Sequence, residues 1–247
     1  MILPSIAILI SLLSFVVAWQ GRVDGARAEL LEYLARIVQL DRAATRRNGH
    51  LINALAQQCD AIVRLHKPWQ LRLSPTVYRM LGEYLLLDTD ELSAASNMLE
   101  RGIRSARRRN NNLELIRCRR AQGELAAAQF DPKKMRELFD SAINLAESRA
   151  SDTQPAIRAS KNRTYAFGIF AALVANEHNH SNPEWAQIAR EYSAQLGDGM
   201  AELRARGSLE VARRAHRLKH PTPPEFEEIQ LTEWQQLWDA RDPSGAA

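Results

Sequence analysis

The sequence predicts an all-α protein, and three observations lead to this prediction. Proline and glycine are sparse inside long stretches of the chain, with 10 Pro and 11 Gly in 247 residues. Residues that favour helices, mainly Ala, Leu, Arg, Glu and Gln, dominate those stretches. No run of alternating β-branched residues reaches the length of a strand. We therefore expect an amino-terminal membrane helix, then an amphipathic helical stalk, then a domain of α-helical hairpins.

The first element, at residues 2–19, is predicted to be a single transmembrane helix. The segment contains no charged residue, and a helix of this length reaches about 27 Å, close to the hydrocarbon thickness of a bilayer. Trp19 stands where an interfacial aromatic residue belongs. Residues 1–20 would thus anchor the chain, with residues 2–19 in contact with the lipid bilayer.

Two other interpretations of this segment stay open, a cleaved signal peptide and a buried core helix. Val16 and Ala18 suit a signal peptidase, but no Lys or Arg precedes the apolar run. The first basic residues, Arg22, Arg27 and Arg36, follow it. Positive-inside reasoning therefore predicts an amino terminus outside and the bulk of the chain in the cytoplasm, with export as the alternative.

The second element, residues 21–67, is predicted to consist of amphipathic helices. Apolar residues recur every seven positions at Val23, Leu30, Ile37, Ala44 and Leu51. Such a stripe is typical of a coiled-coil stalk, through which the chain would form a homo-oligomer, or of a helix that packs onto the rest of its own domain. Both interpretations stay open.

The third element, residues 68–220, is predicted to be a domain of helical pairs. Ser74 followed by Pro75 is typical of a helix start. Two pairs follow, "SPTVYRMLGEYLLLDTDELSAASNMLERGIRSA" and "IRCRRAQGELAAAQFDPKKMRELFDSAINLAES". Each has a helix that contains glycine, a short turn and a second helix. A third pair is expected at residues 155–176 and 183–196.

These pairs resemble tetratricopeptide repeats. The matching positions are Tyr78, Leu81, Gly82, Leu85, Ala94 and Met98 in the first pair, Gly123, Phe139 and Ala142 in the second, and Gly168 and Ala186 in the third. The resemblance implies stacked hairpins that bind proteins on the surface lined by their first helices. Gly82 and Gly123 are 41 residues apart, against about 34 in the family, so we expect extra residues to loop out near "RRRNNNL".

The last element, residues 221–247, is predicted to be a proline-rich hinge and an acidic tail helix. Residues 225–242 hold six acidic residues and one arginine, a net charge of −5 in a chain of net charge +4. The candidate docking residues of this helix are apolar: Phe226, Leu231, Trp234 and Trp238. So short a helix buries little apolar surface alone, and we expect it to dock onto its own body or into another protein.

An arginine-rich stretch, residues 101–120, contains eight Arg and one acid, Glu114. Arg101, Arg104, Arg107 and Arg108 form a candidate surface for an acidic protein or anionic lipid. The alternative is a solvated helix end whose arginines suit the helix dipole. Nucleic acid is an unlikely partner, because no aromatic residue for base stacking lies between Arg101 and Arg120.

No motif predicts catalysis, a cofactor or a metal. His216 and His220 share a helical face, but they lack a nearby carboxylate, and His178 and His180 lie in a loop-like segment. Cys59 and Cys118 are read as buried small residues and not as a disulfide.

The predicted function is that of a membrane-anchored helical-repeat protein that binds other proteins as an adaptor, scaffold or assembly factor. The alternatives are an envelope structural protein with its helical domain outside the cytoplasm, and an enzyme of an unrecognised all-α family.

Overall fold

The computed structural model describes residues 2–42, 49–86, 92–149, 155–178 and 182–196. These residues form helices and their connections, with no strand among them, which confirms the all-α prediction. The chain divides into two compact units, residues 1–73 and 74–247. The predicted division into anchor, stalk, repeat domain and tail stays a prediction, and residues 221–247 lie outside the described part.

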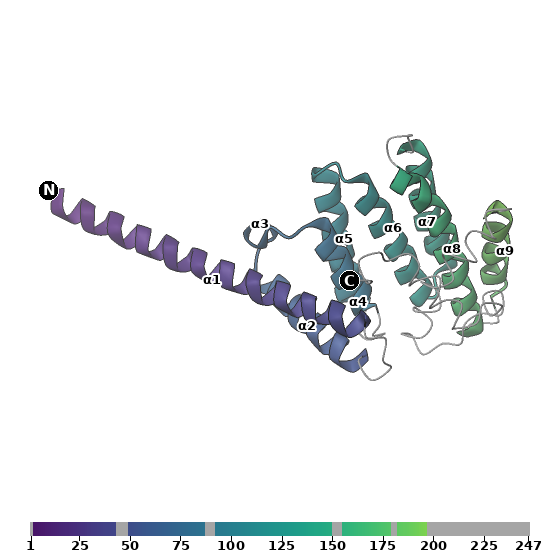
Figure 1. Cartoon of the computed structure of the whole chain (residues 1–247), viewed down its shortest axis with the longest axis horizontal. Coiled ribbons are helices and arrows are strands. Elements are labelled where there is room, and N and C mark those ends of the chain that lie inside the picture. Colours follow the sequence, from purple (N-terminus) through teal and green to yellow (C-terminus); the bar gives the residue numbers. More distant parts are fainter. Residues whose placement is uncertain (1, 43–48, 87–91, 150–154, 179–181, 197–247) are drawn as a thin grey trace, which may run out of the picture. The chain divides into compact units, whose positions relative to one another are not determined.

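The first unit contains three helices, α1 (Ile2–Arg42), α2 (Gly49–Leu65) and α3 (Pro68–Leu71). Helix α1 packs against both α2 and α3 (Figure 1). Its buried residues are Val23, Leu30, Leu34 and Ile37, spaced three, four or seven apart. They meet a matching stripe on α2: Ile52, Ala56, Cys59 and Val63. Packing within the unit thus accounts for this part of the heptad pattern, and a homo-oligomer through the stalk stays an untested prediction.

The stripe does not continue to Leu51, which is 55% exposed. Helix α1 ends at Arg42 and Leu51 belongs to α2, so the two segments of the sequence pattern lie on different helices with different buried faces. Ala44 lies outside the described residues.

The prediction of a transmembrane helix at residues 2–19 is wrong. Within the part of the chain that the structure describes, no helix is long and apolar enough to cross a membrane. Helix α1 continues without a break to Arg42. The structure describes the exposure of its side chains from Val17 onward. From Arg22 onward the helix has a charged residue about once per turn, so this part does not extend the apolar segment that precedes it. The predicted orientation of the chain rested on this anchor and is not tested by the structure.

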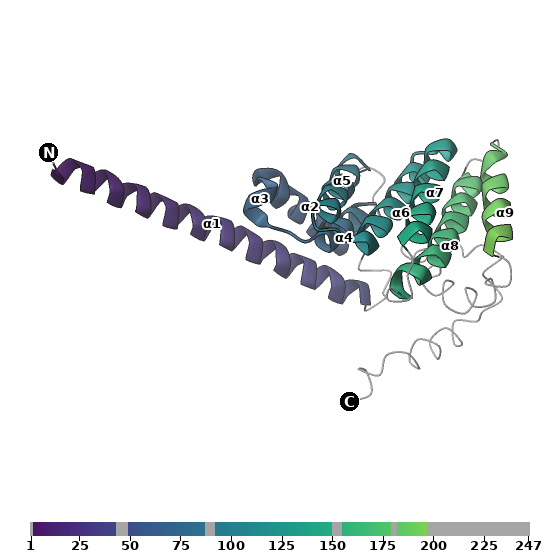
Figure 2. The same ribbon diagram turned by 90° about the horizontal axis from the view of Figure 1, so that it is seen from above.

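Up to residue 196, where the described part of the chain ends, the second unit forms three antiparallel helical hairpins. The first pairs α4 (Pro75–Leu85) with α5 (Leu92–Arg108), the second α6 (Asn112–Ala128) with α7 (Pro132–Arg149), and the third α8 (Pro155–His178) with α9 (Glu184–Leu196). Helix α6 also contacts α4 and α8, so the first helices of the hairpins form one layer (Figure 2). We call this surface the first-helix layer.

Capped turns join the helices. Ser74 Oγ accepts a hydrogen bond from the Val77 amide at 3.3 Å, which confirms the predicted start of α4. Asn111 and Asp131 cap α6 and α7 in the same way, through the amides three residues on, at 3.1 and 2.9 Å. The residues before them, Asn110 and Phe130, adopt left-handed φ angles of 52° and 57°.

The expectation that residues near "RRRNNNL" loop out is wrong. Helix α5 runs to Arg108 and α6 begins at Asn112, so only a tight turn separates them. The residues beyond the period of the family are absorbed as additional helix, because the arginines continue the helical pattern of α5 and Asn111 caps α6 at once.

A glycine marks the closest approach of the two helices in each hairpin. A Cβ atom added to Gly82 would lie 2.7 Å from Leu99, one added to Gly123 2.6 Å from the Phe139 ring, and one added to Gly168 2.6 Å from the Tyr192 ring. All three glycines lie on the first helix and all three neighbours on the second. This confirms the predicted packing role of the glycines.

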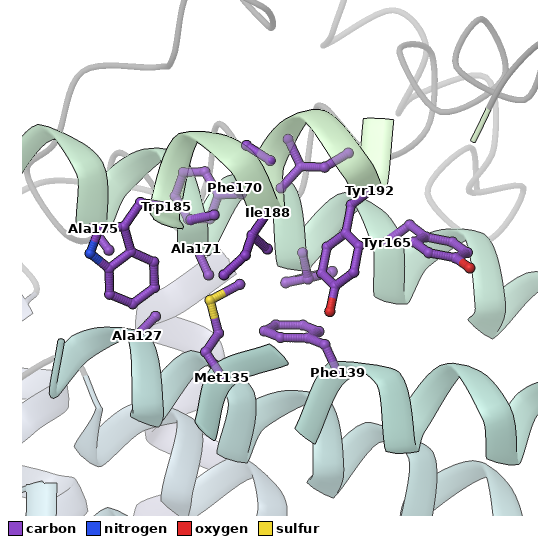
Figure 3. Packing of buried hydrophobic residues seen from close by; sticks show 14 of the residues in the cluster. Ala127, Met135, Phe139, Tyr165, Phe170, Ala171, Ala175, Trp185, Ile188 and Tyr192 are labelled. Carbon is purple, nitrogen blue, oxygen red and sulfur yellow. The ribbon is translucent and has the colours of Figure 1, made fainter. Parts of the chain in front are cut away.

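The largest apolar core lies between α6, α7, α8 and α9. Met135 and Phe139 of α7 point toward Ile188 and Tyr192 of α9 (Figure 3). The Tyr192 ring makes edge-to-face contacts with the Phe139 and Tyr165 rings, at centroid distances of 6.4 and 5.6 Å. The Phe139–Tyr192 contact thus joins the second hairpin to the third, whereas the Tyr165–Tyr192 contact lies within the third hairpin.

We expect Gly123→Ala to destabilise the second unit by about 1–3 kcal/mol, because the rigid Phe139 ring leaves no room for a methyl group. Gly25→Ala in α1 is the control, since nothing lies within 4 Å of the added atom. In that open helical position alanine should stabilise by up to about 1 kcal/mol. Denaturant unfolding followed by circular dichroism measures both effects, and a Gly123→Ala variant as stable as the parent would contradict this packing.

Candidate functional site

A buried charge network joins α4 to α6 in the first-helix layer. Arg79 of α4 donates from Nη1 to Glu83 at 2.7 Å and from Nε to Glu114 of α6 at 2.9 Å. Arg117 donates to the other oxygen of Glu114 at 2.7 Å. The Glu114 side chain is only 5% exposed, so its charge is stabilised mainly by these two arginines.

The pKa of Arg79 depends on its burial and on the two carboxylates beside it. Burial alone would lower the pKa of its guanidinium, but the carboxylates of Glu83 and Glu114 outweigh that effect and raise the pKa above its ordinary value. Arg79 is therefore fixed in its charged form and ties two hairpins together.

A second arginine joins α6 to α8. The guanidinium carbon of Arg120 lies 4.0 Å from the centroid of the Phe167 ring, a cation–π geometry. Arg120 is 6% exposed. The first-helix layer is thus linked across all three hairpins by arginines, from α4 through α6 to α8.

The sequence prediction missed the residues of this network, although the sequence holds a signal for them. The pattern Arg-x-x-Gly-Glu occurs as "RMLGE" at residues 79–83 and as "RAQGE" at residues 120–124. In both copies the glycine meets the second helix of its hairpin. The arginine and glutamate, four residues apart, share one face of the first helix.

The four candidate residues Arg101, Arg104, Arg107 and Arg108 all lie on α5, and their role as one binding surface stays a prediction. Burial raises the pKa of the Tyr78 hydroxyl. The positively charged guanidinium groups of Arg101, Arg109 and Arg104 oppose this rise. Arg104 also pairs with Glu100 at 3.4 Å on the exposed side of α5.

Arg107 lines an open groove between α5, α6 and α7. The groove measures about 750 Å³, and its lining combines basic, apolar, acidic and uncharged polar side chains: Arg107, Arg119, Leu115, Leu145, Glu137, Asp140, Ser141, Asn144 and Ser148. We call it the α5–α7 groove. Arg108 is exposed and does not line it.

Two like charges face each other in this groove. Burial and the positive charge of Arg107 both lower the pKa of Arg119, against the opposing effect of Glu137. Among the described residues, Arg119 donates one hydrogen bond, from Nη1 to the Gln122 amide oxygen at 3.3 Å. The groove therefore holds positive charge that the described carboxylates do not neutralise at short range.

No cluster of three or more His, Cys, Asp or Glu side chains among the described residues has the geometry to hold a metal ion. His180, His216 and His220 lie outside the described residues, as do the candidate docking residues Phe226, Leu231, Trp234 and Trp238.

Both cysteines are free and buried, as predicted, and they lie in different units. The Cys59 thiol faces the Leu30 carbonyl oxygen at 3.8 Å. Burial raises the pKa of both the Cys59 and the Cys118 thiols to about 12. Neither thiol is poised as a nucleophile, because the reactive thiolate form is disfavoured.

Comparison of the chain with models of protein families, with curated proteins and with solved structures yields no match.

We expect Glu114→Gln to destabilise the protein by about 3 kcal/mol, because Arg79 and Arg117 then lose the carboxylate between them. Glu100→Gln removes the same charge from an exposed pair with Arg104 and should cost less than about 1 kcal/mol. Urea unfolding of both variants measures the difference. Equal losses of stability would show that the network does not join the hairpins.

Cys59 and Cys118 should resist alkylation by iodoacetamide in the folded protein at pH 8. A pKa of about 12 in place of 9.0 lowers the thiolate fraction roughly a thousandfold. The same reaction in guanidinium chloride is the control and should proceed at the rate of exposed thiols. Mass spectrometry counts the modified residues, and rapid labelling of the native chain would contradict the burial of either thiol.

Proposed function

We propose that the chain is a protein-binding module of stacked helical hairpins that acts as an adaptor, scaffold or assembly factor. The observation that carries the proposal is the first-helix layer, in which α4, α6 and α8 come from three hairpins and lie side by side. Such a layer forms a surface long enough for an extended segment of a partner. The resemblance to tetratricopeptide repeats, now joined by a glycine contact in each hairpin, supports the same function.

The side chains of the layer suit a peptide of mixed charge. Glu83, Arg117 and Glu124 are partly exposed there, and Met80 adds an apolar, adaptable side chain. Positive and negative groups alternate within short distances, and such a pattern favours register-specific pairing with a protein over the uniform attraction of a polyanion.

Rigidity is the second support for this proposal. The Arg79–Glu114 pair and the Arg120–Phe167 contact hold neighbouring first helices in register. A preorganised surface loses less conformational entropy on binding than a flexible one. The network thus serves binding indirectly, by positioning the exposed residues around it.

Photo-crosslinking in cells that make the protein tests this function. Benzoylphenylalanine at Met80 places the reactive group on the first-helix layer, and the same residue at Asn97 places it on the exposed side of α5. We expect discrete protein adducts from position 80 and none of the same mass from position 97. Identical adducts from both positions, or none from position 80, would rule out the first-helix layer as the binding surface.

A further inference from the structure

We propose that the α5–α7 groove binds the acidic carboxyl-terminal segment of the same chain, residues 225–242. The groove is separate from the first-helix layer, so the inference goes beyond the proposed function and does not depend on it. Three observations carry it: the partners of the charged groups in the groove, the lining of the groove, and the composition of the chain that follows α9.

The two arginines of the groove form no ion pair within the described residues, although Glu137 acts on Arg119 from a longer distance. Within the described residues Arg107 makes no hydrogen bond or ion pair, and Arg119 makes only the 3.3 Å bond to Gln122. The two arginines are nonetheless close enough for Arg107 to lower the pKa of Arg119. A cluster of like charges costs free energy that an added anionic group would offset.

The acidic groups of the groove, in contrast, already have partners. Glu137 pairs with Lys134 at 2.8 Å, and Asp140 accepts a hydrogen bond from the Tyr192 hydroxyl at 2.9 Å. The formal charges of the lining balance, but Arg107 and Arg119 have no ion pair within the described residues, so they are the groups there that a further carboxylate would pair with. Because Glu137 and Asp140 remain close by, a short segment with a few carboxylates fits better than a long polyanion such as nucleic acid.

The groove also offers apolar surface. Leu115 and Leu145 line it and are only partly buried, and Leu145 packs against a small apolar cluster beneath. An occupant that is both acidic and amphipathic would cover the leucines and place its carboxylates near Arg107 and Arg119.

Residues 225–242 have this composition. They combine six acids and one arginine with the apolar residues Phe226, Leu231, Trp234, Leu237 and Trp238. The tether also favours them, since they follow α9 in the same chain and α9 contacts α7, a wall of the groove. Tethering raises their effective concentration to about the millimolar range, and residues 197–224 are enough chain to reach, at up to about 3.3 Å per residue.

The test uses the full chain with an environment-sensitive fluorophore on a single added cysteine, Gln235→Cys. The native thiols at Cys59 and Cys118 are buried and should not react. We expect blue-shifted emission in the parent protein and loss of that shift in Arg107→Glu/Arg119→Glu. The control Arg108→Glu/Lys133→Glu makes the same change of net charge at exposed residues outside the groove, and it should retain the shift.

A second double variant, Arg107→Gln/Arg119→Gln, removes the two positive charges without reversing them, so it is less disruptive to the fold. Circular dichroism of each variant shows whether the helices are intact. The Gln pair should reduce the blue shift in a folded protein. The proposal is overturned by emission typical of a solvated fluorophore in the parent, by equal loss in the groove and control variants, or by a blue shift that disappears on dilution, which would indicate the tail of a second copy.

Discussion

The contact between a glycine of one helix and a bulky side chain of the next is the constraint on which the second unit depends. Gly82, Gly123 and Gly168 meet Leu99, Phe139 and Tyr192 at distances that leave no room for a Cβ atom. Each contact sets the separation of the two helices in a hairpin. Because Phe139 and Tyr192 also belong to the core between the second and third hairpins, the same contacts determine how those hairpins stack.

The stacking of the hairpins determines which charged residues of the arginine-rich stretch, residues 101–120, are buried and which are exposed. Glu114, the one acid between Arg101 and Arg120, is enclosed by Arg79 and Arg117 and is withdrawn from the surface. Arg120 lies over Phe167 in the interior of the layer. Arg107 and Arg119 instead line the α5–α7 groove, together with Glu137 and Asp140.

The sequence alone predicted the helices of the hairpins, the cap at Ser74 and the packing role of the glycines, because these depend on local propensity and on residue size. It also predicted the burial of Cys59 and Cys118. The transmembrane helix predicted at residues 2–19 is not found in the described part of the chain, where α1 continues as an amphipathic helix to Arg42. The heptad stripe did not reveal whether its partner was another chain or α2, since both bury the same residues.

Only the tertiary structure decided which charges meet. Arg79 and Glu114 are separated by 35 residues, and no local pattern relates them, although the repeated Arg-x-x-Gly-Glu motif marks the face on which Arg79 lies. The arginines of α5 form one group in the sequence, yet they have different neighbours in the fold: Arg101 and Arg104 act on Tyr78 of α4, whereas Arg107 lines the α5–α7 groove. Helix formation follows from neighbours along the chain, whereas electrostatic pairing depends on distances across it, and those distances are set by how closely the hairpins pack.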